Sequence, residues 1–183
     1  TIYNIFQKRV WDANICTTQN CKVKFNGDVL PKQNFEAYAK MHEGVQEVAS
    51  VAGDRWSVCI GPSTDGMEQV SFVNGLCTMK GGTHVDHVAN IVANGIIDDM
   101  AKKIKLKPQQ VKNTFTIFVK ATLENPTFSS QVKSECTSKS PDFGSKFELP
   151  KTFVKNALKT GIADELTALS KFKEMKELAK TDG

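Results

Sequence analysis

The chain has 183 residues, of which 40% are hydrophobic and 24% are charged, and its formal net charge is +4. It is long enough to bury one hydrophobic core with a fragment attached, and it has no run of about 18 apolar residues to span a bilayer. The five cysteines are scattered and include no Cys-x-x-Cys pair, which argues against a disulfide framework or a zinc site and favours reduced thiols inside a cell. The first residues lack an initiator Met and a basic leader, so we expect a piece of a longer protein.

Charge is unevenly distributed along the sequence. Residues 1–100 hold 8 Lys or Arg and 11 Asp or Glu, whereas residues 101–183 hold 16 and 9. Such asymmetry is found in surfaces that face phosphates, and equally in lysines that only solvate helices. Composition alone does not choose between the two.

Three short elements are expected in the first 45 residues. Apolar residues at three- and four-residue spacing indicate helices, and alternation followed by Asn-Gly indicates a strand that ends in a tight turn. The elements are a helix over 3–13 with Ile2, Phe6 and Val10 on one face, a strand over 21–25 ending at Asn26-Gly27, and a helix over 33–42 with Phe35, Tyr38 and Met41 on one face.

The sheet is expected to begin with two strands, over 55–60 and 68–73. The turn Ser63–Gly66 predicts that they pair as a hairpin. A glycine-bearing loop follows, and the apolar spacing over 84–104 then predicts a long helix that packs on the sheet.

The clearest strand pattern covers Phe115–Leu123, where apolar residues recur at every second position. Asn125-Pro126 ends this strand, because proline lacks the N–H of a sheet ladder. One helix follows Pro150, and a last helix over 162–180 has Leu166, Leu169, Phe172 and Met175 inward. The order of elements predicts an α+β domain and leaves its topology open.

The run Gly81-Gly82-Thr83-His84 admits two interpretations. Free amides at a helix start attract anions, but no Walker A Gly-Lys-Ser/Thr follows. We favour a structural role, in which the glycines permit a sharp entry and Thr83 caps the helix. A metal at His84 and His87 is improbable, because their three-residue spacing does not fit a zincin site.

Two groups of polar side chains are candidates for binding. Gln131 and Lys133 follow the strand that Pro126 ends, and lysine offers a charge suited to a terminal phosphate. Four lysines crowd the end of the long helix and are able to neutralise DNA backbone phosphates without reading sequence. They are Lys102, Lys103, Lys105 and Lys107.

Several of these motifs together resemble one family, the ATP-dependent type IIA DNA topoisomerases of eukaryotic type. The resemblance rests on Ser-Phe-Val-Asn at 71–74, Gly-Gly-Thr-His at 81–84, and Asn-Pro-Thr-Phe-Ser-Ser-Gln-Val-Lys at 125–133, which appear in the order found in the transducer domain. Lys-Arg-Val-Trp-Asp at 8–12 is similar to the end of the preceding GHKL ATPase domain. The resemblance divides the chain into 1–45, the C-terminal part of that ATPase domain, and 46–183, the transducer.

The resemblance also implies a fold and a set of contacts. The fold is a ribosomal-protein-like, four-stranded sheet with helices on one face and a left-handed βαβ crossover, ending in a long C-terminal helix. In the family a Gln-Thr-Lys loop reaches the γ-phosphate of ATP, which carries over to Gln131, Val132 and Lys133, with Lys133 as the catalytic contact. Val132 replaces the usual Thr and removes one hydroxyl. The family also has a DNA-contacting segment, which corresponds here to Lys102, Lys103, Lys105 and Lys107.

The expected function is coupling of ATP-dependent gate closure to double-strand DNA passage, in a nuclear homodimer. The chain is expected to be inactive alone, because most of the ATP pocket, the Mg²⁺ site of the full enzyme and the cleavage core lie elsewhere in the polypeptide. Two alternatives use the same fold. One is the middle domain of an Hsp90-like chaperone or MutL-like repair ATPase, against which the Ser-Phe-Val-Asn and Gly-Gly-Thr-His motifs argue. The other is a stand-alone nucleic-acid-binding module.

Overall fold

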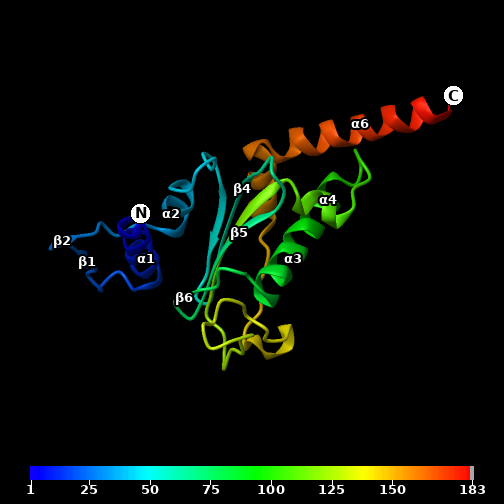
Figure 1. The fold of residues 1–183 in the computed structure, drawn as a ribbon. Coiled ribbons are helices and arrows are strands. Elements are labelled where there is room, and N and C mark those ends of the chain that lie inside the picture. Colours follow the sequence, from blue (N-terminus) through cyan, green and yellow to red (C-terminus); the bar gives the residue numbers. More distant parts are fainter. Residues whose placement is uncertain (182–183) are drawn as a thin grey trace.

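The computed structural model describes residues 1–181 as a mixed α+β fold with a five-stranded sheet and a separate two-stranded ribbon (Figure 1). None of the helices in this part of the chain is both long and apolar enough to cross a membrane. In chain order the elements are α1 (Ile2–Cys16), β1 (Lys24–Phe25), β2 (Asp28–Val29), α2 (Phe35–Lys40), β3 (Ala49–Ala52), β4 (Trp56–Pro62), β5 (Glu68–Val73), β6 (Leu76–Cys77), α3 (Thr83–Met100), α4 (Pro108–Lys112), β7 (Phe115–Ala121), η1 (Ser140–Phe143), α5 (Lys151–Ala157), η2 (Leu158–Ile162) and α6 (Ala163–Thr181).

The strands of the main sheet lie in the order β3-β4-β7-β5-β6. All neighbours are antiparallel except β5 and β7, which are parallel. Val119 of the central strand β7 pairs with Val58 of β4 on one side and with Ser71 of β5 on the other. The sheet therefore has one strand more than the predicted four. Neither β3, with four residues, nor β6, with two, was predicted, because strands this short carry little periodic signal in the sequence.

The predicted hairpin of β4 and β5 is wrong, because β7 lies between them. Their connection arches over the start of β7, where the Ser63 N–H donates to the Thr114 carbonyl at 2.9 Å. Two strand spacings are about 10 Å, and the residues from Ser63 to Met67 reach about 17 Å, so a short connection accommodates an intervening strand. β5 instead pairs with β7 through the crossover that contains α3, and the left-handedness of this crossover stays a prediction.

Both faces of the sheet are covered, whereas helices were predicted on one face only. On the first face, α3, α5 and the start of α6 pack over alternate residues of the central strands, including Val58, Ile117 and Val119. On the second face, α2 and the end of α1 pack over the other alternate residues. This smaller core contains Ile15, Phe35, Tyr38, Ala39, Val45, Cys59, Phe72 and Phe118.

Helix α1 is confirmed, but its predicted apolar face is not buried by the described residues. Ile2 is 72% exposed and Phe6 is 59% exposed, whereas Asp12 is buried near the other end of the helix. The Asp12 carboxylate accepts hydrogen bonds from the Tyr38 hydroxyl at 2.6 Å and the Lys8 ammonium at 2.6 Å. A buried, doubly bonded carboxylate therefore attaches α1 to α2, and the first turns of α1 face outward.

Helix α6 projects from the body of the domain toward the C-terminus (Figure 1). Gly161 has a φ of 107°, which breaks the helical path between α5 and α6 and lets the chain change direction. Leu166 is buried as predicted, but Phe172 and Met175 are 58% and 68% exposed. The apolar side of α6 beyond its first turns is thus uncovered within residues 1–176, contrary to the predicted inward orientation.

Candidate functional site

The loop that contains Gln131 and Lys133 is the tip of a short ribbon formed by residues 127–137. Phe128 and Cys136 form an antiparallel bridge, and the Ser129 N–H donates to the Glu135 carbonyl at 3.1 Å. The Lys133 N–H closes the tip by donating to the Ser130 carbonyl at 3.0 Å. The chain thus presents Gln131–Lys133 at a defined turn and not on a free strand exit.

Lys133 displays its charge to solvent. Its side chain is exposed and forms no ion pair within residues 1–181, and its Nζ lies 5.7 Å from the centre of the Phe128 ring. Its φ of 56° lies in the left-handed region, which costs a non-glycine residue about 1 kcal/mol. The turn therefore holds this lysine in an unfavourable backbone conformation, with its ammonium free to receive an anion.

A cavity of about 600 Å³ lies between the tip of the ribbon and the first helix of the chain. Val132, 78% exposed, lines it together with Ile5 and Arg9 of α1. Lys8 also faces this cavity, but its charge is paired with Asp12. The ribbon tip is therefore next to the element that comes from the N-terminal end of the chain.

The arm of the ribbon that follows its tip, residues 134–137, is joined to residues 80–83; we call it the descending arm. The Lys80 N–H donates to the Ser134 carbonyl at 2.9 Å, the Cys136 N–H to the Gly81 carbonyl at 3.1 Å, and the Thr83 N–H to the Cys136 carbonyl at 3.0 Å. Gly82 has a φ of 131°, and a Cβ placed on it would lie 2.6 Å from the Cys136 nitrogen. Only glycine allows this close approach of the two backbones. We call residues 80–83 the clamp.

The prediction that Thr83 caps α3 is wrong. The N-cap residue is Gly82, and no side chain caps the helix. The Thr83 hydroxyl instead donates to the Ser138 carbonyl at 2.5 Å. This carbonyl belongs to the residue that follows the ribbon, so a residue that looks like a cap in the sequence serves a long-range contact.

The helix start also contains a buried polar network. The Ser71 and Thr78 hydroxyls lie 2.6 Å apart, and the Thr78 hydroxyl lies 3.3 Å from Nε2 of His84. His84 is fully buried, and burial lowers its pKa to about 4. A neutral, enclosed imidazole has no access to substrate, so this network holds β5 against α3.

The four candidate DNA-binding lysines are on the segment between α3 and α4. All four are exposed, while Ile104 and Leu106 between them pack against the core. This alternation turns the ammonium groups outward and fixes their backbone. Figure 1 shows the segment next to α4, at the opposite end of α3 from the ribbon. The lysines are Lys102, Lys103, Lys105 and Lys107.

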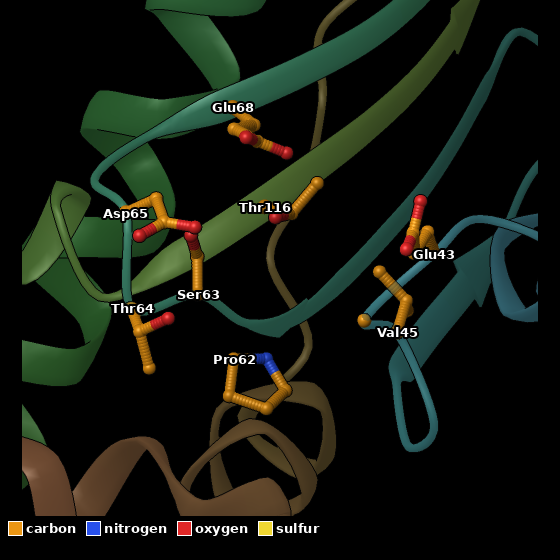
Figure 2. Close-up of a pocket in the computed structure, with 9 residues that line it drawn as sticks. Glu43, Val45, Pro62, Ser63, Thr64, Asp65, Glu68 and Thr116 are labelled. Atoms are coloured by element: carbon orange, nitrogen blue, oxygen red, sulfur yellow. The ribbon is translucent and has the colours of Figure 1, made fainter.

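An acidic cavity of about 530 Å³, which sequence reasoning did not find, lies on the second face of the sheet (Figure 2). Glu43 follows α2, while Asp65 and Glu68 lie in the connection before β5 and at its first residue, and Thr116 of β7 completes the lining. Glu43 is more than 20 residues from the other two carboxylates, and the segments carry no shared motif. Negative charge repels phosphates, so this cavity is not a nucleotide or DNA site.

The buried thiols of the described residues are poorly suited to nucleophilic chemistry. Burial raises the pKa of Cys59 to about 12 and that of Cys16 to about 11, so neither thiol is a ready nucleophile. All five cysteines are free thiols. Within residues 1–181, no three His, Cys, Asp or Glu side chains are arranged to hold a metal ion.

Comparison with known proteins places these features in context. The family described as DNA gyrase B matches residues 25–181. DNA topoisomerase 2 of Acanthamoeba polyphaga mimivirus is 40% identical over 190 residues, which cover 98% of this chain and 15% of that protein. The chain thus spans about one seventh of the length of such relatives.

Solved structures agree with this similarity. The ATPase region of Saccharomyces cerevisiae topoisomerase II is similar with a TM-score of 0.83 and 30% identity, over 92% of this chain and 45% of that one. The ATPase and transducer domains of DNA topoisomerase II from Balamuthia mandrillaris are similar with a TM-score of 0.83 and 29% identity, over 95% of this chain and 45% of that one.

Proposed function

Because the chain belongs to the DNA gyrase B family of type II DNA topoisomerases, we propose that it couples ATP binding to DNA passage. In this proposal residues 1–45 complete an ATPase domain and residues 46–183 form the transducer. The family match agrees with the Ser-Phe-Val-Asn and Gly-Gly-Thr-His motifs, which argued against an Hsp90-like chaperone or a MutL-like repair ATPase. The coupling role itself depends on the geometry of the ribbon.

The observation that supports the proposal is the exposed, unpaired Lys133 on a backbone-clamped tip beside α1. An ammonium at a fixed position is suited to a terminal phosphate that arrives from a neighbouring module. We assign the γ-phosphate contact to Lys133 and its support to the Gln131 amide. Val132 contributes no polar group, so the contact depends on the lysine more than in a loop with Thr.

Bound ATP would supply the anhydride bond whose hydrolysis drives the cycle. The described residues offer Lys133 and Gln131 to its phosphate end. They offer no ligand cluster for Mg²⁺, so we assign the metal and the adenine pocket to the preceding part of the polypeptide. We therefore expect the chain alone to have no ATPase activity above background, and measurable turnover by the pure chain would contradict this assignment.

The coupling proposed here is a population shift between two arrangements of the domains. Lys133 contacts the γ-phosphate in one arrangement and loses that contact after hydrolysis, so ATP favours the first arrangement by the free energy of this contact. α6, which projects from the domain, would pass the movement to the cleavage core. The proposal also includes binding of double-stranded DNA by the four lysines between α3 and α4, homodimerisation of the complete enzyme, and a nuclear location.

The test uses the complete topoisomerase that contains this chain. We expect Lys133→Ala to slow ATP turnover and strand passage by about 10- to 100-fold, the factor for one charged contact worth about 1.4–2.7 kcal/mol. DNA cleavage without nucleotide should persist. Lys139→Ala, which removes an exposed lysine nearby, is the matched control and should turn over normally. Normal ATP hydrolysis by Lys133→Ala would rule out the sensor role.

The exposed lysines between α3 and α4 favour one second candidate, a nucleic-acid-binding module that works without ATP. Binding by the chain alone that depends on salt and is unchanged by Lys133→Ala would support this candidate. It would be discarded if the chain bound no DNA while the complete enzyme lost activity with Lys133→Ala.

A further inference from the structure

The ribbon is tied to the rest of the domain through the clamp. Within residues 1–181, the backbone hydrogen bonds that leave the ribbon all go to residues 80–83. The remaining backbone hydrogen bonds of residues 127–137 join its two arms or close its tip. The position of Lys133 therefore depends on how firmly the descending arm is held at the start of α3.

We propose that Thr83 is a positioning residue for Lys133, an inference that rests on the proposed function of this lysine. Thr83 makes two bonds here: its N–H donates to the Cys136 carbonyl of the arm at 3.0 Å, and its hydroxyl donates to the carbonyl of Ser138, the residue that follows the ribbon. The two bonds hold the arm at Cys136 and just beyond its end. Cys136 is itself buried, so the arm is fixed at a point three residues from Lys133.

Gly82 sets the distance at which Thr83 acts. The two backbones run so close at Gly82 and Cys136 that a side chain at position 82 would overlap Cys136. This approach brings the Thr83 hydroxyl within reach of the arm. Gly82 and Thr83 thus have separate tasks, because the glycine removes a steric obstacle and the threonine supplies the attachment.

The hydroxyl is the part of Thr83 that a substitution removes cleanly. Valine keeps the size and branching of threonine and leaves the Ser138 carbonyl without this donor, whereas serine keeps the donor. Losing one such hydrogen bond, worth about 1 kcal/mol, would lower the equilibrium constant between the placed and the displaced arm by about five-fold. Because Lys133 acts on the phosphate only when placed, we expect kcat to fall more than the KM for ATP rises.

The experiment compares ATP turnover by variants of the complete topoisomerase. Thr83→Val should lower kcat by up to about five-fold and Thr83→Ser should restore it. Thr160→Val, which also removes a hydroxyl that donates to a backbone carbonyl, in that case of Ala157, is the matched control and should leave kcat unchanged. In a Lys133→Ala background, Thr83→Val should cause no further loss, because its effect passes through the lysine.

A second measurement does not depend on activity. Trypsin cleaves after lysine, and Lys133 lies at the exposed tip, so Thr83→Val should raise the rate of cleavage after Lys133 while the thermal midpoint of unfolding stays within a few degrees. If Thr83→Val fails to fold, Thr83→Ala takes its place in both assays.

Normal kcat and normal cleavage in the variant that folds would overturn the inference, and so would a loss in kcat that persists undiminished in the Lys133→Ala background. Normal turnover by Lys133→Ala would instead reject the proposed function, and the cleavage rate would then still decide whether Thr83 holds the arm.

Discussion

Buried His84 makes the stability of the fold depend on pH in a defined direction. Its side chain is fully buried, its Nε2 contacts Thr78, and its Nδ1 has no hydrogen-bond partner in the described part of the chain. Burial lowers its pKa from 6.5 to about 4. A protonated imidazole would be a charge without water or a carboxylate beside it, so the folded state resists protonation.

The sign and size follow from proton linkage. Above pH 6.5 the imidazole is neutral in both the folded and the unfolded chain, and the full stability is present. Between pH 6.5 and 4 the unfolded chain binds a proton that the folded chain does not, so stability falls as the pH falls. At about 1.4 kcal/mol per pH unit, the loss due to His84 reaches about 3 kcal/mol near pH 4 and does not grow further below it.

Two measurements on the chain check this. An NMR titration of the His84 ring should give a midpoint near pH 4. Urea unfolding at pH 7.5 and at pH 4.5 should show that His84→Gln loses less stability on acidification than the unchanged chain, because one titrating group has been removed. Burial also lowers the pKa of His42 and of His87, so His42→Gln serves as the control that leaves the His84 contribution in place. A His84 midpoint near 6.5, or the same acid sensitivity in His84→Gln, would refute the reasoning.

Two further predictions concern α1 and the lysine segment. Tyr38→Phe should lower the free energy of unfolding, measured by urea denaturation, by about 1.5–3 kcal/mol, because the buried Asp12 carboxylate loses a donor. Lys8→Met should lower it by less than about 1 kcal/mol, since the Lys8 side chain is 53% exposed. Equal losses in the two variants would contradict this ranking. Charge reversal to Glu in the lysine segment should weaken DNA binding by the complete enzyme and reduce the slope of log K against log salt by about 0.9 per lost phosphate contact. The exposed Lys22→Glu is its control, and unchanged salt dependence would exclude the segment as a DNA contact. The residues to reverse are Lys102, Lys103, Lys105 and Lys107.

Local patterns located the elements of the fold well and their neighbours poorly. The alternation over 115–123 and the spacing over 84–104 each report the burial of one chain segment. β7 and α3 lie there, although β7 ends at Ala121 and α3 at Met100. The pairing of β4 with β7 joins residues about 60 positions apart, and nothing in either strand identifies its partner. The turn at 63–66 pointed to the wrong partner because a tight connection is also able to cross a strand end.

The amphipathic helices show a second physical limit. A helical period identifies an apolar face but not what covers it. α2 and α3 bury their apolar faces, whereas the apolar side chains at the start of α1 and along α6 are exposed in the described residues. Both exposed faces lie near the ends of a chain that spans about one seventh of its relatives. Periodicity therefore identified the apolar face of each helix, but the predicted burial of that face is wrong for the start of α1 and for α6 beyond Leu166.

The difference between local signals and long-range contacts also explains which parts of the candidate site could be predicted. Gln131 and Lys133 are recognisable from a short motif, because the chemistry they offer is contained in their own side chains. The clamp is not recognisable, because Gly82 and Thr83 act on Cys136 and Ser138, more than 50 residues away. The Gly-Gly-Thr-His sequence looked like a helix start, and α3 does begin there. The sequence did not show that Gly82 packs against the backbone of Cys136, or that the Thr83 hydroxyl donates to Ser138 and not within its own helix. A motif whose local interpretation is correct therefore also makes a tertiary contact, and in our proposal this contact positions Lys133.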